Sequence, residues 1–251
     1  MHSLPPLVYN SLIHMDKSAK DPVKIQNMFT TIAPRYDLLN RVLSLGIDSH
    51  WRKFAVNQLP KGEKARFIDI ATGTCDVALE IIKRHPPGTT VEAVDFSEGM
   101  LALGQEKVRQ AGLSDRIDVH FGDATNLPFD DDTFNGSTIA FGIRNVQDYK
   151  QGIREMGRVV KSGGRVVILE FTSIQSRFFR PLYVYYITRV LPFIGELISG
   201  KKGAYKYLPD SMLDFPPPEK FKQAMEEAGL MDVIYYSLSF GITAVHVGTV
   251  P

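Results

Sequence analysis

Short apolar runs alternate with stretches of helical periodicity from about residue 66 to residue 171. Strands are expected near residues 66–71, 90–95, 116–121, 134–141 and 164–171. Helices are expected between them, where apolar residues recur at helical spacing near 75–85, 98–112 and 148–161. Alternation of this kind is typical of parallel βαβ units, so the pattern predicts a doubly wound α/β fold.

The alternation stops after Phe171, and residues 172–217 are rich in Tyr, Phe, Leu and Ile without a strand pattern. A helix is expected over 218–229, followed by β-rich runs over 231–240 and 243–250. These two runs predict an antiparallel hairpin on the sheet edge. Added to the five parallel strands, the hairpin gives a mostly parallel sheet of seven strands.

The aromatic segment 172–217 has two interpretations. It is too interrupted to span a bilayer, because Arg180, Arg189 and Glu196 lie within it and a spanning helix needs about 20 mostly apolar residues. Its apolar side chains are therefore covered in another way, either by packing on the domain core or by acting as a lid over an apolar substrate. The arginines could also contact anionic lipid head groups.

The composition indicates one globular domain. The chain has 251 residues, of which 44% are hydrophobic and 23% are charged. We expect a flexible extension over residues 1–20 and a single folded domain over 21–251. The formal net charge of +1 gives no reason to expect a nucleic-acid partner.

Cysteine usage and the N-terminus bear on metal content and location. Cys75 is the single cysteine of the sequence, so an intramolecular disulfide is excluded. Cys and His residues show no metal-ligand spacing, and we expect no metal. The first residues lack the pattern of a secretory signal, so we expect a cytoplasmic protein.

The first predicted strand is followed by a turn of small residues: Ala71, Thr72, Gly73 and Thr74. Such a turn lets a ligand approach the backbone amides at the start of a helix, and Gly73 can take a positive φ. Asp95 ends the next predicted strand, where a carboxylate can accept hydrogen bonds from both ribose hydroxyls. This combination fits nicotinamide dinucleotides and S-adenosylmethionine. A plain tight connection between strand and helix is the alternative.

Glycine spacing disfavours the dinucleotide. A pyrophosphate seat needs G-x-G-x-x-G, whereas this turn reads Ala71-x-Gly73-x-Cys75, with a single glycine. The following strands, with residues 120–124 closing the third and 127–134 leading into the fourth, give an order that resembles the class I S-adenosylmethionine-dependent methyltransferases. The resemblance implies a Rossmann-like fold, with S-adenosyl-L-methionine as cofactor.

The same resemblance implies the cofactor-binding residues. Asp123 and Ala124 would line the adenine, and Asp95 would hold the ribose. The small-residue loop, with Ala71, Gly73 and Thr74, would enclose the methionine moiety.

Further motifs carry a closer resemblance. They are Met28-Phe29, Ile32-Ala33, Tyr36-Asp37, Asn40, Leu43-Ser44, Gly46 and Trp51-Arg52; then Phe141-Gly142-Ile143-Arg144-Asn145-Val146; then Gly163-Gly164-Arg165 with Leu169-Glu170-Phe171; and Tyr205, Tyr207-Leu208, Ser211 and Phe215-Pro216. From about residue 23 onward the chain is similar to the ubiquinone/menaquinone biosynthesis C-methyltransferases. This resemblance implies methyl transfer to a ring carbon of a prenylated quinol, most simply demethylmenaquinol to menaquinol, with a methoxy-polyprenylbenzoquinol left open as acceptor.

The family resemblance also implies the catalytic residues. Arg144 and Asn145 follow the fourth strand, at the edge where open α/β sheets bind ligands, and could stabilise a phenolate and orient a ring oxygen. The alternative for Arg144 is an ion pair with a loop carboxylate such as Asp148. Tyr36 would belong to a helical cap over residues 21–60, and either present its hydroxyl to the quinol or only brace the cap.

Tyr183 and Tyr207, in the lid segment over 172–217, are expected to contact the substrate. The chain departs from the family pattern at Cys75, Asn135 and Ala140, where Gly, Asp and Ser are usual. A thiol at a helix start can have a lowered pKa, so Cys75 is either a reactive thiol or a small residue tolerated in the turn.

Other functions remain open from the sequence. They are methyl transfer to oxygen or nitrogen of a soluble acceptor, a non-catalytic S-adenosylmethionine-binding scaffold in a quinone-biosynthesis complex, and an oxidoreductase. A hydrophobic acceptor must be collected from a bilayer, so we expect peripheral contact with the inner face of the membrane. Whether the protein forms a homodimer is open.

Overall fold

The computed structural model describes residues 22–172, 180–199 and 207–251. The expected extension over 1–20 lies outside these residues, as do residues 173–179 and 200–206 of the aromatic segment. The sheet has the strand order β3-β2-β1-β4-β5-β7-β6. The strands are β1 (Arg66–Ile70), β2 (Thr90–Asp95), β3 (Ile117–Phe121), β4 (Phe134–Ala140), β5 (Val160–Phe171), β6 (Met231–Leu238) and β7 (Thr243–Thr249).

Five of these strands run parallel, and β7 and β6 pair antiparallel at one edge. The predicted seven-stranded, mostly parallel fold with its C-terminal hairpin is therefore confirmed. β5 begins earlier than expected, because Val160 already pairs with Phe134 before a bulge restores the register at Gly136 and Arg165. For the same reason the preceding helix ends at Arg158 instead of near 161.

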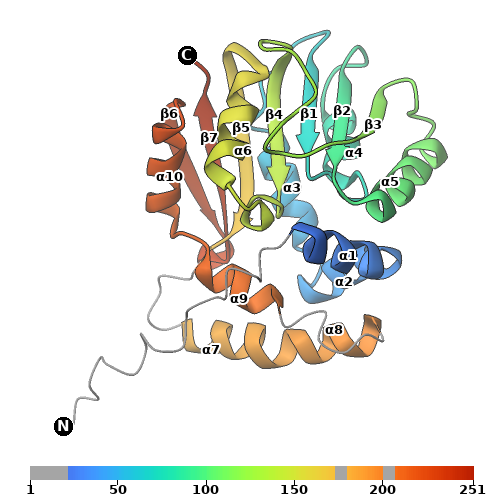
Figure 1. Ribbon diagram of the computed structural model, residues 1–251, viewed down its shortest axis with the longest axis vertical. Coiled ribbons are helices and arrows are strands. Elements are labelled where there is room, and N and C mark those ends of the chain that lie inside the picture. The colour runs from blue at the N-terminus through green and yellow to red at the C-terminus, as the bar shows by residue number, and fades with distance from the viewer. Residues whose placement is uncertain (1–21, 173–179, 200–206) are drawn as a thin grey trace.

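Helices cover both faces of the sheet (Figure 1). One face packs against α3 (Asp48–Val56), α4 (Asp76–Arg84) and α5 (Glu98–Gln110), and the other against α6 (Tyr149–Arg158) and α10 (Pro218–Glu227). The alternation within β1 assigns the faces, since Phe67 belongs to the first core and Ile68 and Ile70 to the second. Burial of both faces explains why the parallel strands read as continuous apolar runs.

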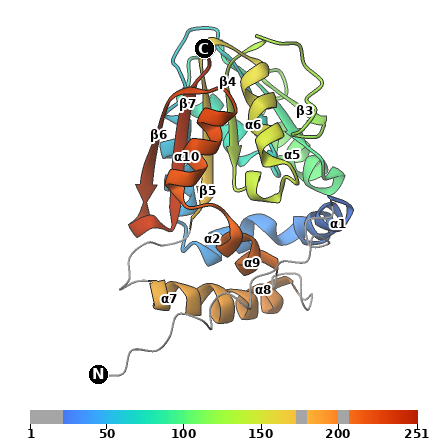
Figure 2. The same ribbon diagram turned by 60° about the vertical axis from the view of Figure 1, so that its left-hand side comes forward.

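A separate helical layer lies across the carboxyl ends of the parallel strands (Figures 1 and 2). It is built from α1 (Pro22–Ile32), η3 (Ala33–Arg35) and α2 (Tyr36–Leu43), together with α7 (Arg180–Tyr185), the π-helical turn η5 (Tyr186–Val190), α8 (Leu191–Ser199) and α9 (Tyr207–Asp214). Its own small core includes Leu39, Ile187, Leu191 and Met212. The N-terminal segment and the aromatic segment thus pack on one another, while α3 packs on the sheet. Among the described residues, no helix is long and apolar enough to cross a membrane.

Candidate active site

The turn after β1 takes an irregular backbone path. Ala71, Gly73 and Cys75 all have positive φ, of 50°, 56° and 66°. Only glycine adopts such a conformation without cost, so two of the three positions hold strain of the kind found at functional sites. The path is fixed by Thr72, whose hydroxyl donates to Asp69 at 2.6 Å and whose backbone N–H donates to the carbonyl of Val94.

Asp95 sits at the end of β2, as the sequence predicts, and faces this turn. Its two carboxylate oxygens accept hydrogen bonds from the backbone N–H groups of Gly73 and Ser97, both at 2.8 Å. Burial raises the pKa of Asp95 to about 6, although the two backbone donors favour the ionised carboxylate and so lower the pKa. After these two hydrogen bonds the carboxylate still has lone pairs that can accept from a ligand.

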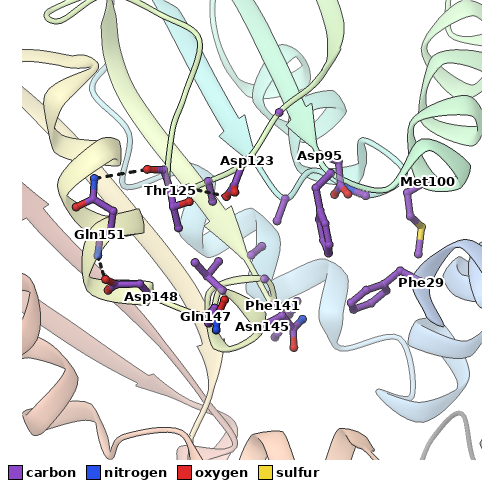
Figure 3. Close-up of a pocket in the computed structure, with 18 of the residues that line it drawn as sticks. Phe29, Asp95, Met100, Asp123, Thr125, Phe141, Asn145, Gln147, Asp148 and Gln151 are labelled. Atoms are coloured by element: carbon purple, nitrogen blue, oxygen red, sulfur yellow. Dashed lines mark hydrogen bonds between the residues drawn. The ribbon is translucent and has the colours of Figure 1, made fainter. Parts of the chain in front are cut away.

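A cavity of about 400 Å³ opens above the carboxyl ends of β1, β2, β3 and β4. Figure 3 shows Asp95, Met100 and Phe29 at one end of it and Asp123, Thr125 and Gln151 at the other. Polar side chains therefore gather at the end beside Gln151, Asp95 lies at the other end, and Phe141 lies between them. We call this space the polar cavity.

A second cavity, of about 510 Å³, adjoins the first and is lined mostly by apolar and aromatic side chains. Its walls come from α1, α2, α7, η5 and α9, and from the turns around Leu45 and Phe240. Phe29, Tyr36 and Phe141 line both spaces. We call this second space the apolar cavity, and the three shared rings mark the point where the two cavities meet.

Arg144 and Asn145 lie in the 3₁₀ turn η4 (Ile143–Asn145) and face different cavities. Asn145 lines the polar cavity, and Arg144 lines the apolar one. Arg144 is 6% exposed, and its Nη1 donates to fully buried Glu170 at 2.6 Å and to the carbonyl of Phe141 at 2.6 Å. The alternative role of Arg144, an ion pair with a carboxylate, is therefore present, but its partner is Glu170 and the expectation of Asp148 is wrong. Asp148 caps α6 by accepting from the backbone of Gln151 at 2.9 Å.

Lys107 of α5 ties the helical cap to the loop that follows β1. Its ammonium lies 2.6 Å from Asp37 of α2 and 2.7 Å from Asp76 of α4. Thr74 completes the cluster by donating to Asp37 at 2.6 Å. The Thr74 side chain therefore engages this cluster and does not line the polar cavity, although the resemblance places it beside the cofactor.

The polar cavity is lined by all five other predicted cofactor residues, namely Ala71, Gly73, Asp95, Asp123 and Ala124. Tyr36 lines both cavities and Tyr183 the apolar one. Tyr207 begins α9, but its side chain lies outside the described residues. The sequence analysis did not single out Phe29, Met100 or Gln151 as wall residues. Phe29 alone carried a signal, since it belongs to a family motif.

Cys75 is fully buried at the start of α4, against Gly104 of α5. Burial raises the pKa of its thiol to about 12. The possibility of a reactive, low-pKa thiol is therefore wrong, and Cys75 is a small packing residue.

Comparisons with known proteins agree with this geometry. The model of the ubiE/COQ5 methyltransferase family matches residues 15–250. The chain is 51% identical to the ubiquinone/menaquinone biosynthesis C-methyltransferase UbiE of Geobacter sulfurreducens, over 90% of this chain and 88% of that one. It is 47% identical to the demethylmenaquinone methyltransferase of Thermus thermophilus, over 89% of this chain and 100% of that one.

Solved structures share the fold at low sequence identity. An S-adenosylmethionine-dependent methyltransferase from Aquifex aeolicus superposes with a TM-score of 0.56 at 17% identity, covering 80% of this chain and 89% of that one. The [4+2]-cyclase SpnF superposes with a TM-score of 0.69 at 14% identity, covering 93% and 97%. Because a cyclase shares the architecture, the fold by itself leaves the reaction open.

Proposed function

This chain belongs to the ubiE/COQ5 methyltransferase family, and on that premise we propose that it methylates a ring carbon of a prenylated quinol, with demethylmenaquinol as its main acceptor. The observation that carries the proposal is the junction of two cavities of different character at Phe29, Tyr36 and Phe141. One suits a nucleoside with an amino-acid tail, and the other suits a ring with an apolar chain. A methyl group passed between them would cross at the three rings.

The cofactor is S-adenosyl-L-methionine, and the residues of the polar cavity fit it. Asp95 keeps acceptor lone pairs for two ribose hydroxyls after taking the N–H groups of Gly73 and Ser97. Asp123 and Ala124 would line the adenine, and the turn at Gly73 leaves backbone groups accessible to the methionine end. The sulfonium supplies an activated methyl group, and the protein's task is to hold donor and acceptor in line.

The apolar cavity suits the acceptor. A ring carbon attacks well only when a neighbouring hydroxyl is ionised or nearly so, and a phenol with a pKa near 10 needs help at neutral pH. Arg144 lies in this wall and can donate to the ring oxygen. Asn145, on the other side of the same turn, would help to fix the orientation of the reactants at the junction.

Methyl transfer to two acceptors tests the choice of substrate. The protein would be incubated with labelled S-adenosylmethionine and either reduced demethylmenaquinone or a methoxy-polyprenylbenzoquinol, and the lipid product analysed by mass. We expect product from demethylmenaquinol at the higher rate. Product from neither acceptor, with S-adenosylhomocysteine binding intact, would refute the proposal in favour of another acceptor or a binding scaffold.

The rim of the apolar cavity supports peripheral contact with a membrane. Leu45, Leu182 and Phe240 line the cavity and yet are 85%, 69% and 82% exposed. Exposed arginines at Arg180 and Arg189 accompany them on the aromatic segment. Exposed apolar side chains beside cationic ones are typical of surfaces that enter the interface of an anionic bilayer.

Co-sedimentation with vesicles tests this contact. The wild-type protein should sediment with phosphatidylglycerol-containing vesicles, and Leu182→Asp should reduce the bound fraction while leaving S-adenosylhomocysteine affinity unchanged. Lys161→Gln, which also lowers the net charge by one but lies exposed at the amino end of β5, away from this rim, serves as the matched charge control. Wild-type protein that stays in the supernatant at every vesicle concentration would contradict the contact.

A further inference from the structure

Two hydrogen-bond donors in the wall of the apolar cavity have no partner. Within the described residues, the buried side-chain polar atoms without a hydrogen bond belong to His85, Thr89, Arg144, Tyr183, Thr243 and His246. Of these six residues, only Arg144 and Tyr183 line either cavity. The atoms concerned are Nε of Arg144 and the hydroxyl of Tyr183. A buried donor without an acceptor is costly, so the coincidence of two at one cavity calls for a ligand.

Neighbouring tyrosines show that this wall can satisfy a hydroxyl. Tyr186, three residues along the same helical run, donates to the carbonyl of Leu43 at 2.7 Å. The Tyr36 hydroxyl has Asn40 as its side-chain partner. Tyr183 is therefore the exception among the three tyrosines that line the cavity within the described residues.

The guanidinium of Arg144 likewise has some N–H groups engaged within the protein and one, Nε–H, without a partner. Its Nη1 is taken by Glu170 and the carbonyl of Phe141, which fix the plane of the guanidinium. The buried carboxylate of Glu170 also balances the charge of Arg144. What the arginine offers a ligand is therefore its remaining directed N–H groups, the unpartnered Nε–H among them, more than a free positive charge.

We propose that Tyr183 O–H and Arg144 Nε–H together bind the acceptor's ring oxygen next to the carbon that is methylated, and stabilise it as a phenolate. This inference rests on the proposed function and makes Tyr183 a catalytic residue of that reaction. The hydroxyl proton leaves to solvent, the ring carbon forms its bond to the methyl as the sulfur–methyl bond breaks, and the proton on that carbon is then lost while the oxygen is protonated again. One proton is released overall.

The electrostatics of the wall suit such a two-donor site. Burial raises the pKa of Tyr183 above its ordinary value, opposed by the nearby charge of Arg144 and reinforced by Glu170. Tyr183 therefore stays protonated and acts as a donor, never as the base, at physiological pH. Among the described residues, the other titratable groups that line the cavity are Tyr36, Asp48, Arg52 and Tyr186, and Asp48 is paired with Arg52 at 2.6 Å.

Tyr183→Phe tests the proposal by removing one oxygen atom. Its kcat should fall roughly 10- to 100-fold with KM within about threefold, since the donor acts on charge that develops in the reaction. The rising limb of kcat against pH should move to higher pH, because the acceptor hydroxyl ionises less readily. The melting temperature should stay the same or rise, because the lost hydroxyl has no partner in the free protein.

Tyr186→Phe is the matched control, because it removes a hydroxyl that is engaged with Leu43. It should lower the melting temperature and leave the pH profile where it is. A purely structural role for Tyr183 predicts that Tyr183→Phe behaves like this control, and that result would overturn the proposal. Arg144→Lys, which keeps a cation beside Glu170 but loses Nε–H, should move the pH profile in the same direction as Tyr183→Phe.

A binding measurement separates this inference from the proposed function. The probe is a prenylated 4-methoxy-1-naphthol, a quinol monoether whose ionisation is visible by absorbance. Bound to the wild-type protein with S-adenosylhomocysteine, its pKa should lie below that of the free compound, and Tyr183→Phe should raise it. If the bound probe has the same pKa in the wild-type protein and in Tyr183→Phe, the two-donor site is refuted. Absence of methyl transfer to any prenylated quinol by the wild type would refute the proposed function instead.

Discussion

Replacement of Asp95 by asparagine tests the nucleoside site with the least disturbance of shape. The carboxylate accepts from Gly73 and Ser97 and has lone pairs left for two ribose hydroxyls. An asparagine keeps one acceptor oxygen, and its NH₂ group would face one of the two backbone N–H donors. The variant therefore loses at least one ribose hydrogen bond and weakens the turn that Gly73 anchors.

The expected loss of binding free energy in Asp95→Asn follows from the negative charge of the carboxylate that accepts the hydrogen bonds. Hydrogen bonds to charged groups contribute about 1.5–3 kcal/mol each, so losing one and weakening another costs about 2–4 kcal/mol of binding free energy. At about 1.4 kcal/mol per tenfold change, the Kd for S-adenosylhomocysteine should rise roughly 30- to 1,000-fold.

The pH dependence of binding gives an independent check. The folded pKa of Asp95, about 6, is raised above its ordinary value of 3.8, and ribose hydroxyls donate best to the ionised form. Binding is therefore linked to loss of a proton: the wild-type Kd should be flat above about pH 7 and rise by up to tenfold per unit below pH 6. Asp95→Asn should lack this dependence.

Isothermal titration calorimetry from pH 5 to pH 8 measures both effects. Glu92→Gln is the matched control, since Glu92 lies on the same strand but pairs with Arg66 at 2.7 Å and does not line the polar cavity. Its Kd should equal that of the wild type. An Asp95→Asn protein that binds within threefold of the wild type, or a wild-type Kd that does not change between pH 7 and pH 5, would refute the assignment of the ribose to Asp95.

Three further predictions concern other parts of the site. Arg144→Ala should lower kcat roughly 100- to 1,000-fold while calorimetry finds S-adenosylhomocysteine binding unchanged. A large loss of cofactor affinity would contradict the assignment of Arg144 to the acceptor site. Lys107→Met should raise the cofactor Kd roughly two- to fivefold, because the partly exposed ammonium joins Asp37 of the cap to Asp76. An unchanged Kd would show that cofactor binding does not depend on this link. Cys75 should react with a thiol reagent only in denaturant, and rapid labelling of the native protein would contradict its burial.

The fold was predictable because it depends on local periodicity. Buried parallel strands read as apolar runs, and the alternation of runs with helices left few possible topologies. Asp95 was predictable for a related reason, since parallel strands bring their carboxyl ends to one edge of the sheet. The positions of β1, β2 and β4 in the chain were enough to place the polar cavity.

Side-chain partners were less predictable because they lie far apart in the chain. Arg144 pairs with Glu170, 26 residues away, and nothing in the sequence favours that carboxylate over nearby Asp148. Thr74 turns to Asp37, 37 residues away, so a position in the cofactor loop did not reveal its contact.

Consecutive residues in an irregular turn pose a different problem. Arg144 and Asn145 belong to one motif, yet the tight 3₁₀ turn directs one side chain to the apolar cavity and the other to the polar cavity. Strand and helix periodicities do not apply to such a turn. The division of roles between the two residues therefore required the structure.

The most direct test of the central claim is the position of the transferred methyl group. Incubating the protein with S-adenosylmethionine labelled as CD₃ and a prenylated demethylmenaquinol, then locating the label by mass spectrometry and NMR, shows which bond has formed. The two adjoining cavities and the donors of the apolar wall predict CD₃ on the ring carbon beside a hydroxyl. CD₃ on an oxygen, or no transfer despite cofactor binding, would contradict the account.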